Sequence, residues 1–298
     1  MDNDTIYKPV LTKCPLCDYS QISDHYTIDK YKYRFKTSKC NSCGFIFMNP
    51  QFTEEIINSM YDMNYYSGNS DYSYLDERDI LSYSEYVWNS RIDFITKYVP
   101  GGNFLDIGSS FGGLLQSAKK KFNPFGIELS EYSAQYSKKF FGENIHNGTL
   151  DNHNFEYNTM NVITMIELIE HLEHPKKAIS ECYKLLKKDG LLVIQTANME
   201  GLQAKMQKEN YAYYMPGHLS YFSKRNLRQI LEQTGFSKIE FFHPVEFGLL
   251  PKLKKSSHSF KSILDYTAWI RISFYHILSK IHFGNFAATS SMVVYAIK

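Results

Sequence analysis

Residues 105–113 read LDIGSSFGG, and residues 126–130 read GIELS. The first stretch predicts a strand that ends in a glycine-rich turn and enters a helix, because Gly108 and Gly112 permit a tight turn and let a ligand approach the backbone. The second stretch predicts a strand that ends in an acid. In an open α/β sheet, such a pair forms a nucleotide-sized site at the carboxyl ends of the strands.

The position of this acid indicates what the site holds. Glu128 lies twenty residues after Gly108, the offset at which an acid accepts hydrogen bonds from ribose hydroxyls. Asp106 lies at the end of the first strand, where a carboxylate can orient the turn and bind a cationic ligand group. The turn is not the full dinucleotide fingerprint, because Ser110 occupies the middle glycine position, and it lacks the ending of a phosphate-binding P-loop. Taken alone, the turn is also compatible with a simple strand–helix connection.

The whole chain sets broad limits on function. Its 298 residues suffice for one large core and a small appended module. A net charge of +2 gives no global attraction to nucleic acid. The first residues lack the pattern of a signal peptide, and no stretch reaches the ~18 apolar residues of a membrane span. We therefore expect a cytoplasmic protein with reduced cysteines.

Strand and helix patterns alternate through most of the sequence. Residues 53–99 predict helices that end at Pro100, and alternation begins at Asn103. This order predicts an α/β fold with a mostly parallel sheet covered by helices on both faces. The expected strands are Phe104–Ile107, Pro124–Glu128, Asn161–Met165, Leu191–Thr196, Lys238–His243 and Met292–Ile297.

Residues 252–283 permit two interpretations. Lysines at positions 252, 254 and 255 precede a segment rich in Trp, Ile, Phe and Tyr, and charges at 265, 271 and 280 interrupt it. One interpretation is a helix that packs on the core before the final strand. The other is an interfacial amphipathic helix that touches a membrane surface.

Two Cys-x-x-Cys pairs near the N-terminus predict a metal site. Cys14 and Cys17 are separated from Cys40 and Cys43 by 22 residues, which suits tetrahedral zinc with four thiolate ligands. Disulfides are disfavoured by the expected compartment, and a redox pair is disfavoured because there are two pairs. Four cysteine ligands leave no open position, so we expect a structural zinc that stabilises a segment too small to fold alone. Cys182, on the apolar face of a predicted helix, is interpreted as a core residue.

These stretches resemble the class I S-adenosylmethionine (SAM)-dependent methyltransferases, from residue 14 to residue 298. Residues 105–114 resemble the first motif of the family, and residues 161–175 resemble the fourth-strand motif of ubiquinone-biosynthesis-like methylases. Residues 185–193 and 216–223 resemble the segments that follow. The resemblance implies a Rossmann-like seven-stranded sheet with a reversed final strand. It divides the chain into a zinc-binding module (1–52), a helical linker or lid (53–100) and a methyltransferase core (101–298).

The resemblance also assigns cofactor contacts to positions of this sequence. Asp106 and the glycine turn would hold the methionine portion of SAM, Glu128 the ribose, and residues 149–151 after the third strand would lie near the adenine. The end of the fourth strand would face the cofactor. In chain order these positions are Asp106, Gly108, Ser109, Ser110, Phe111, Gly112, Glu128, Leu129, Leu150, Ile166 and Glu167.

A four-cysteine module ahead of a methylase core resembles methyltransferases of sugar and surface-glycan biosynthesis. Residues 49–66, with Tyr61, Tyr65 and Tyr66, strengthen this resemblance. It implies a small-molecule acceptor, most directly a sugar nucleotide or glycan intermediate, that is methylated at oxygen or carbon. It also implies that the zinc module forms one wall of the acceptor site. A lipid-like or quinone acceptor and a non-catalytic scaffold are the alternatives. The sequence indicates no oligomeric state.

Methylation at oxygen or carbon requires a base, whereas the displacement at the sulfonium carbon mainly needs alignment and a dry pocket. Histidine suits this role because its pKa lies near neutral pH. His218, on a loop after the fifth predicted strand, is the first candidate, and His171 is the second. Tyr221, with Tyr213 and Tyr214, could hold the acceptor. The alternatives are a supporting role for the histidines, with helix capping for His171, and core packing for the tyrosines.

Overall fold

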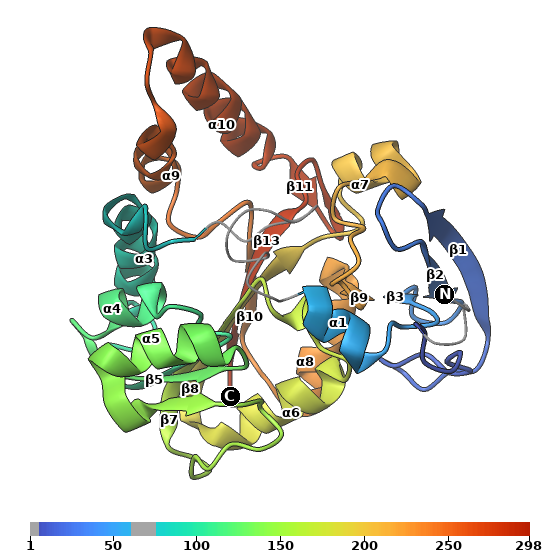
Figure 1. The fold of residues 1–298 in the computed structure, drawn as a ribbon, viewed down its shortest axis with the longest axis horizontal. Coiled ribbons are helices and arrows are strands. Elements are labelled where there is room, and N and C mark those ends of the chain that lie inside the picture. The colour runs from blue at the N-terminus through green and yellow to red at the C-terminus, as the bar shows by residue number, and fades with distance from the viewer. Residues whose placement is uncertain (1–5, 61–75) are drawn as a thin grey trace.

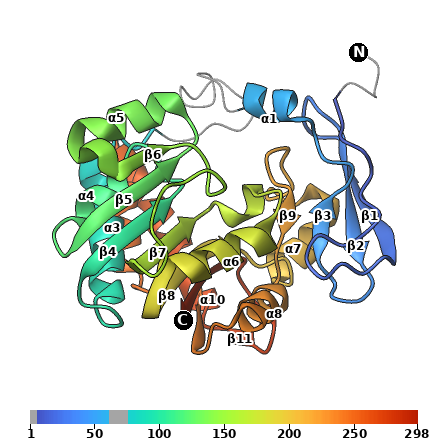
Figure 2. The ribbon, with the colours of Figure 1, turned by 90° about the horizontal axis from the view of Figure 1, so that it is seen from below.

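The computed structural model of the protein describes residues 6–60 and 76–298 (Figure 1). The predicted contribution of Tyr61, Tyr65 and Tyr66 lies outside the described residues, as does the middle of the expected linker. Figure 2 shows the N-terminal strands at one end of the molecule and helices α4 and α5 at the other.

The main sheet has seven strands in the order β10-β13-β8-β7-β4-β5-β6. All of its neighbours pair in parallel except β13, which is antiparallel to both β8 and β10. This confirms the predicted Rossmann-like sheet with a reversed final strand. The strands are β4 (Gly102–Ile107), β5 (Phe122–Glu128), β6 (Ile145–Asn147), β7 (Met160–Ile166), β8 (Leu186–Ala197), β10 (Ile239–Phe242) and β13 (Ser291–Ile297).

β4, the first strand of this sheet along the chain, lies where the order of the strands reverses direction. β4 pairs with β5 on one side and with β7 on the other. Chain connections therefore leave β4 in opposite directions, the arrangement in which open α/β sheets bind ligands at the carboxyl ends of their strands. The glycine turn after β4, the acid at the end of β5 and the residues that end β7 all meet at this edge.

Alternating side chains of the strands fill two apolar layers. Phe104, Val162 and Val193 belong to one layer, with residues of α3 (Leu81–Ile95), α4 (Gly113–Ala118) and α5 (Glu131–Phe141). Leu105 and Ile163 belong to the other, with residues of α6 (Pro175–Leu185) and α8 (Lys224–Thr234). Helices thus cover both faces, as the alternation of predicted strands and helices indicated.

The N-terminal module forms a second, antiparallel sheet with a strand from later in the chain. β1 (Ile22–Ile28), β2 (Phe35–Cys40) and β3 (Ile46–Met48) follow one another, and β9 (Ser220–Tyr221) pairs with β3 through Ile46 and Tyr221. The carbonyl of Cys43 accepts hydrogen bonds from the side chains of Arg225 and Asn226 on α8. The module is therefore joined to the core by strand pairing and by polar contacts, which its sequence did not indicate.

The remaining helices are α1 (Glu54–Met60), α7 (Leu202–Gln207), α9 (Leu250–Ser256) and α10 (Thr267–Leu278). The last two lie between β10 and β13, followed by the short hairpin of β11 (His282–Phe283) and β12 (Phe286–Ala287). Figure 1 shows α10 projecting from the body of the molecule. No residue of α10 is fully buried, but one of its faces is half-buried and Tyr275 contacts Ser291, so α10 lies on the surface with that face against the body of the protein. Among the described residues, no helix is long and apolar enough to cross a membrane.

Candidate cofactor and acceptor site

The turn between β4 and α4 is tight. Gly108 and Gly112 have φ values of 76° and 80°, and Ser110 has a φ of 47°. A Cβ atom on Gly108 would lie 3.1 Å from the side chain of Leu168, so glycine fits this position in both conformation and space. Ser110 adopts the left-handed conformation that a glycine takes readily, which explains how the turn forms without the middle glycine of the dinucleotide fingerprint.

Glu128 contacts this turn directly. It is buried at the end of β5, and its Oε2 accepts a hydrogen bond from the amide of Ser110 at 2.7 Å. Its Oε1 accepts one from the amide of Ser130 at 2.8 Å. Burial raises the pKa of Glu128, and these amide bonds oppose the rise. A carboxylate has about four acceptor positions, so Glu128 retains capacity for ribose hydroxyls.

Asp106 is a second buried carboxyl group at the same edge. Its Oδ1 accepts a hydrogen bond of 2.6 Å from the hydroxyl of Thr164 on β7. Burial raises the pKa of Asp106 to about 7, and the charge of Arg91 only partly opposes the rise. Because a buried carboxylate is stabilised by a nearby positive charge, Asp106 is suited to a cationic group such as the amino group of a methionine moiety.

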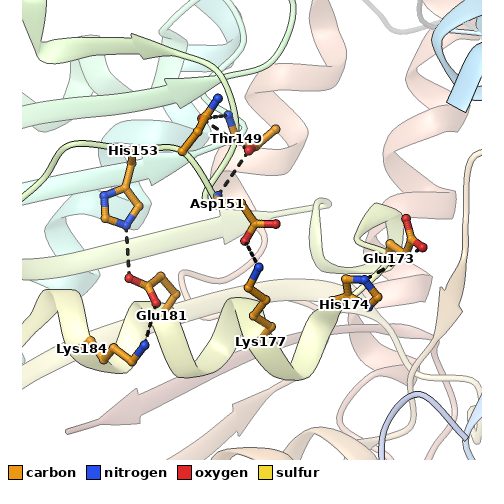
Figure 3. A network of polar contacts seen from close by, with 9 residues as sticks. Thr149, Asp151, His153, Glu173, His174, Lys177, Glu181 and Lys184 are labelled. Carbon is orange, nitrogen blue, oxygen red and sulfur yellow. Dashed lines mark hydrogen bonds and ion pairs between the residues drawn. The ribbon is translucent and has the colours of Figure 1, made fainter.

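The loop after β6 carries the residue predicted for the adenine side. Its start is fixed to β5, because the amide of Gly148 donates to the carbonyl of Glu128 at 2.9 Å. Figure 3 shows the loop attached to α6, where Lys177 pairs with Asp151 at 2.8 Å. Leu150 is largely buried between these anchors, whereas Leu129 is 62% exposed. The exposed Leu129 side chain offers an apolar surface next to Glu128.

Ile166 ends β7 beside β4, and Glu167 follows it directly. Glu167 has a φ of 52°, its amide donates to the carbonyl of Gln195 at 2.9 Å, and its Oε1 accepts from the Gln195 side chain at 2.6 Å. This left-handed conformation turns the chain at the carboxyl edge of the sheet. The side chain of Glu167 is held by β8 next to the crevice.

A buried polar network behind Glu167 was missed by sequence reasoning. Arg91 of α3 donates to Glu246 at 2.6 Å and also to Gln195, so it links α3, β8 and the segment after β10. Nearby Lys252 of α9 is half-buried, and its loss of hydration lowers its pKa to about 8. The signal in the sequence was an arginine within the apolar spacing of α3, and nothing there indicated its partners.

His171 and His218 lie against one another. Their ring centroids are 4.6 Å apart. Nδ1 of His171 lies 2.8 Å from the carbonyl of Gly217, and Nδ1 of His218 lies 2.8 Å from the carbonyl of Tyr213. Since a carbonyl only accepts, each Nδ1 carries the proton and each Nε2 carries the lone pair in the neutral ring. Burial lowers the pKa of both histidines, and for His218 the neighbouring His171 lowers it further.

Glu170 completes this polar cluster. It is fully buried and accepts hydrogen bonds from the hydroxyls of Tyr213 at 2.6 Å and Thr196 at 3.0 Å. Burial raises its pKa well above the usual value, and the charge of Glu167 adds to this. Ligand atoms of Glu170, His171 and His218 all lie within 4.8 Å of one another. His171 binds Gly217 rather than capping α6, whose N-terminal cap is His174.

The predicted tyrosines surround this cluster. The ring of Tyr213 lies 4.3 Å from that of His218, and Tyr221 on β9 lies 6.4 Å away. The ring of Tyr214 lies 4.8 Å from that of Tyr221, tilted by 51°. The buried hydroxyl of Tyr221 has no hydrogen-bond partner among the described residues. The structure thus brings the predicted histidines and tyrosines together, although they are far apart in sequence.

The four cysteines of the module also converge. The Sγ atoms of Cys14 and Cys43 are 3.7 Å apart, and those of Cys17 and Cys40 are 3.6 Å apart. With Zn–S bonds of about 2.3 Å, a tetrahedral site places its sulfurs about 3.8 Å apart. Burial raises the pKa of Cys17 to about 11, so a cation is needed to hold this group as a thiolate. The geometry and donor set fit zinc. Cys182 is fully buried in the core, as expected.

A switch-point crevice with a glycine turn, two acids and a reversed final strand defines a class I SAM-dependent methyltransferase. The family described as "Methyltransferase domain" matches residues 80–240, more than half of the chain, and the chain belongs to it.

Two further proteins are similar to this chain. An uncharacterized protein of Methanocaldococcus jannaschii is 24% identical over 168 residues, which are 53% of this chain and 75% of that protein. Phosphoethanolamine N-methyltransferase 2 of Haemonchus contortus, solved with phosphomonomethylethanolamine and S-adenosylhomocysteine, has a TM-score of 0.54 at 15% identity. That alignment covers 91% of this chain and 70% of the other, and it shows a shared fold.

Proposed function

We propose that this methyltransferase acts on the oxygen or carbon of a small molecule, most directly a sugar nucleotide or a glycan intermediate, and that His218 is its base. The observation that carries the proposal is the contact between buried His218 and half-buried His171, which follows Glu167 by four positions in the chain. An amine acceptor has a lone pair of its own once it is neutral. A hydroxyl or a carbon beside a carbonyl must lose a proton, and a positioned histidine can take it.

The cofactor would lie across the ends of β4, β5 and β7. Asp106 and the turn from Gly108 to Gly112 would hold the methionine portion, and Glu128 would hold the ribose, with Leu129 and Leu150 beside the adenine. Ile166 and Glu167 would close the site on the side of β7. Bound SAM supplies a methyl group on a positively charged sulfur. The hydrogen bond from the Ser110 amide to Glu128 supports this placement. It brings the residue predicted to hold the ribose against the turn predicted to hold the methionine portion.

The chemistry assigned to the residues is limited to proton transfer and positioning. Nε2 of His218 takes the proton of the acceptor while the acceptor atom bonds to the methyl carbon and the carbon–sulfur bond breaks. The carbonyl of Tyr213 holds Nδ1 of His218, which fixes the tautomer that leaves the lone pair on Nε2. Tyr221 and Tyr213 would position the acceptor, and His171 would support or share the role of base.

A cavity between the zinc module and the core, lined by Tyr221 and not by His218 itself, supports the acceptor class. Its volume is about 840 Å³, within the range for small-molecule sites. Tyr26, Tyr214 and Tyr221 provide aromatic surface for a base or sugar. The cationic residues that line the cavity are Lys39, Lys205, Lys208 and Arg225. Such a lining is complementary to the diphosphate of a sugar nucleotide.

The acceptor is tested with purified protein, labelled SAM and a panel of sugar nucleotides, read by mass spectrometry for one added methyl group. We expect transfer to at least one sugar nucleotide and none to phosphoethanolamine. Transfer to phosphoethanolamine alone would contradict the proposal. Transfer only to quinones or lipid-like phenols would instead favour the alternative acceptor class, and SAM binding without transfer to any compound would favour a scaffold.

We infer that the four cysteines bind a structural zinc ion, and that the free thiols reflect a reducing, cytoplasmic compartment. Cys40→Ser is expected to lose the single zinc ion per chain and to lower the thermal unfolding temperature strongly, because metal binding contributes to folding. Metal analysis and thermal unfolding measure both effects. Cys182→Ala is the matched control, since this buried cysteine lies outside the cluster. Wild-type protein without zinc, or full zinc in Cys40→Ser, would contradict the inference.

A further inference from the structure

The segment between β10 and β13 exposes an unusual amount of apolar surface. We refer to residues 250–283 as the arm; it contains α9, the short turn Ile263–Tyr266 and α10. No residue of α10 is buried. The exposed apolar side chains of the arm are Leu250, Ile263, Leu264, Tyr266, Ile270, Phe274, Ile277, Ile281 and Phe283, each at least half exposed. An exposed apolar patch of this kind marks a contact surface.

The exposed side chains of α10 form a stripe. Ile270, Phe274 and Ile277 recur every three or four residues, so they share one face of the helix. They are 71%, 59% and 61% exposed. Tyr275 lies off this stripe, and its hydroxyl accepts from the amide of Ser291 at 3.2 Å. The stripe therefore faces away from the body of the protein, which agrees with the projection of α10 in Figure 1.

The charge of the arm differs from that of the rest of the chain. The arm contains five lysines, one arginine and a single acid, Asp265, which gives a net charge of +5. The whole chain carries +2, so the other residues together carry −3. The carboxylate of Asp265 accepts from the amides of Lys261 and Ser262. At 3.6 residues per turn, Arg271 and Lys280 lie on opposite sides of the stripe.

We propose that the arm docks on the surface of an anionic lipid bilayer, with the stripe of α10 in the interface and its flanking cations at the headgroups. An apolar stripe between basic residues is the pattern of interfacial helices, because long basic side chains reach the headgroups while their stems stay apolar. A second copy of the chain would present the same positive charge, so pairing of two arms is opposed by repulsion. The helix lies on the membrane rather than across it, since twelve residues span only about 18 Å.

The docked arm would orient the catalytic crevice. α9 packs against α3, and Lys255 of α9 pairs with Glu77 at 3.0 Å. Lys252 of α9 lies close to Arg91 and Glu167. The arm is therefore attached to the same side of the core as the polar network behind the crevice. The proposal concerns where the enzyme works, and it holds for any acceptor.

The test is flotation of the full-length protein with lipid vesicles. We expect binding to phosphatidylcholine vesicles that contain roughly one-third phosphatidylglycerol, with binding at least about tenfold weaker to pure phosphatidylcholine and weaker in high salt. Phe274→Ser should reduce the partition coefficient about tenfold through lost apolar burial. The double variant Arg271→Gln and Lys280→Gln should reduce binding to anionic vesicles only. Met206→Ser, at an equally exposed apolar residue of α7, is the control and should leave binding unchanged.

Three results would overturn the proposal. One is the absence of binding to anionic vesicles, and another is equal binding to neutral and anionic vesicles. The third is a dimer in solution that Phe274→Ser dissociates, which would assign the stripe to a second copy. Because the substituted side chains are exposed, the variants should keep the unfolding temperature of the wild type, and thermal unfolding verifies this.

Discussion

Replacing His218 by Asn is expected to lower kcat by about 10²- to 10⁴-fold, the usual contribution of a positioned base. The side-chain amide of Asn can still donate to the carbonyl of Tyr213, as Nδ1 of His218 does, but nothing replaces Nε2. The buried contact is therefore kept while the proton acceptor is removed. SAM affinity should stay within about twofold of the wild type, because a base acts mainly in the transition state. Initial rates at saturating SAM and a calorimetric titration with SAM measure the two effects.

The pH profile gives a second signature of the same residue. Burial and the adjacent His171 lower the pKa of His218 well below 6.5. A base with a lowered pKa stays neutral as the solution becomes more acidic, so it remains able to accept a proton at pH 6. We therefore expect kcat at saturating SAM to stay constant from pH 8 to pH 6 and to fall only at more acidic values. A profile that falls with a midpoint near the ordinary histidine pKa would contradict this assignment.

Two comparison variants separate chemistry from packing. His243 is a half-buried histidine whose Nδ1 also binds a backbone carbonyl, that of Ser291, at 3.2 Å. His243→Asn should leave kcat unchanged, because this residue follows β10, the edge strand that pairs with β13. His171→Asn tests the competing candidate. A full loss of rate in His171→Asn with a normal rate in His218→Asn would transfer the role of base to His171.

Local patterns in the sequence predicted the parts of the site that depend on backbone shape. The glycine turn and the acid that ends β5 follow from residue spacing, because each marks a strand end or a turn, whereas the reversed strand β13 was implied by the family resemblance. The cysteine pairs predicted a convergent cluster for the same reason, since each pair forms its own tight turn. These predictions needed no knowledge of which distant side chains meet.

Contacts between distant buried side chains could not be predicted in this way. The hydrogen bond of Thr164 to Asp106 and the bonds of Arg91 to Gln195 and Glu246 join strands and helices that are far apart in sequence. Which of these side chains meet is determined by the packing of the whole sheet. The pairing of β9 with the module has the same origin. For the arm, the sequence left two interpretations, and only the structure shows that α10 has one half-buried face and one exposed apolar stripe.

Replacing Asp106 by Asn is expected to weaken SAM binding about 10- to 100-fold, because a hydrogen bond between charged groups is replaced by one to a neutral amide. The side chain of Asn has almost the same shape, and its oxygen can still accept from Thr164, as Asp106 does at 2.6 Å. The loss would therefore reflect charge rather than packing. A calorimetric titration with SAM measures it, and Asp93→Asn on the exposed face of α3 is the control. An unchanged affinity in Asp106→Asn would exclude Asp106 from cofactor binding.

The same substitution should stabilise the fold at neutral and alkaline pH. The pKa of Asp106 is about 7 in the folded chain against an ordinary value of 3.8. The folded protein therefore binds the proton more tightly than the unfolded chain, and the folding free energy that Asp106 contributes declines as pH rises from about 4 to 7. Asn has no such dependence, so Asp106→Asn should gain up to about 4 kcal/mol above pH 7 and nothing at pH 4. Urea unfolding at both pH values measures the gain, and equal stability of the two proteins at pH 8 would contradict it.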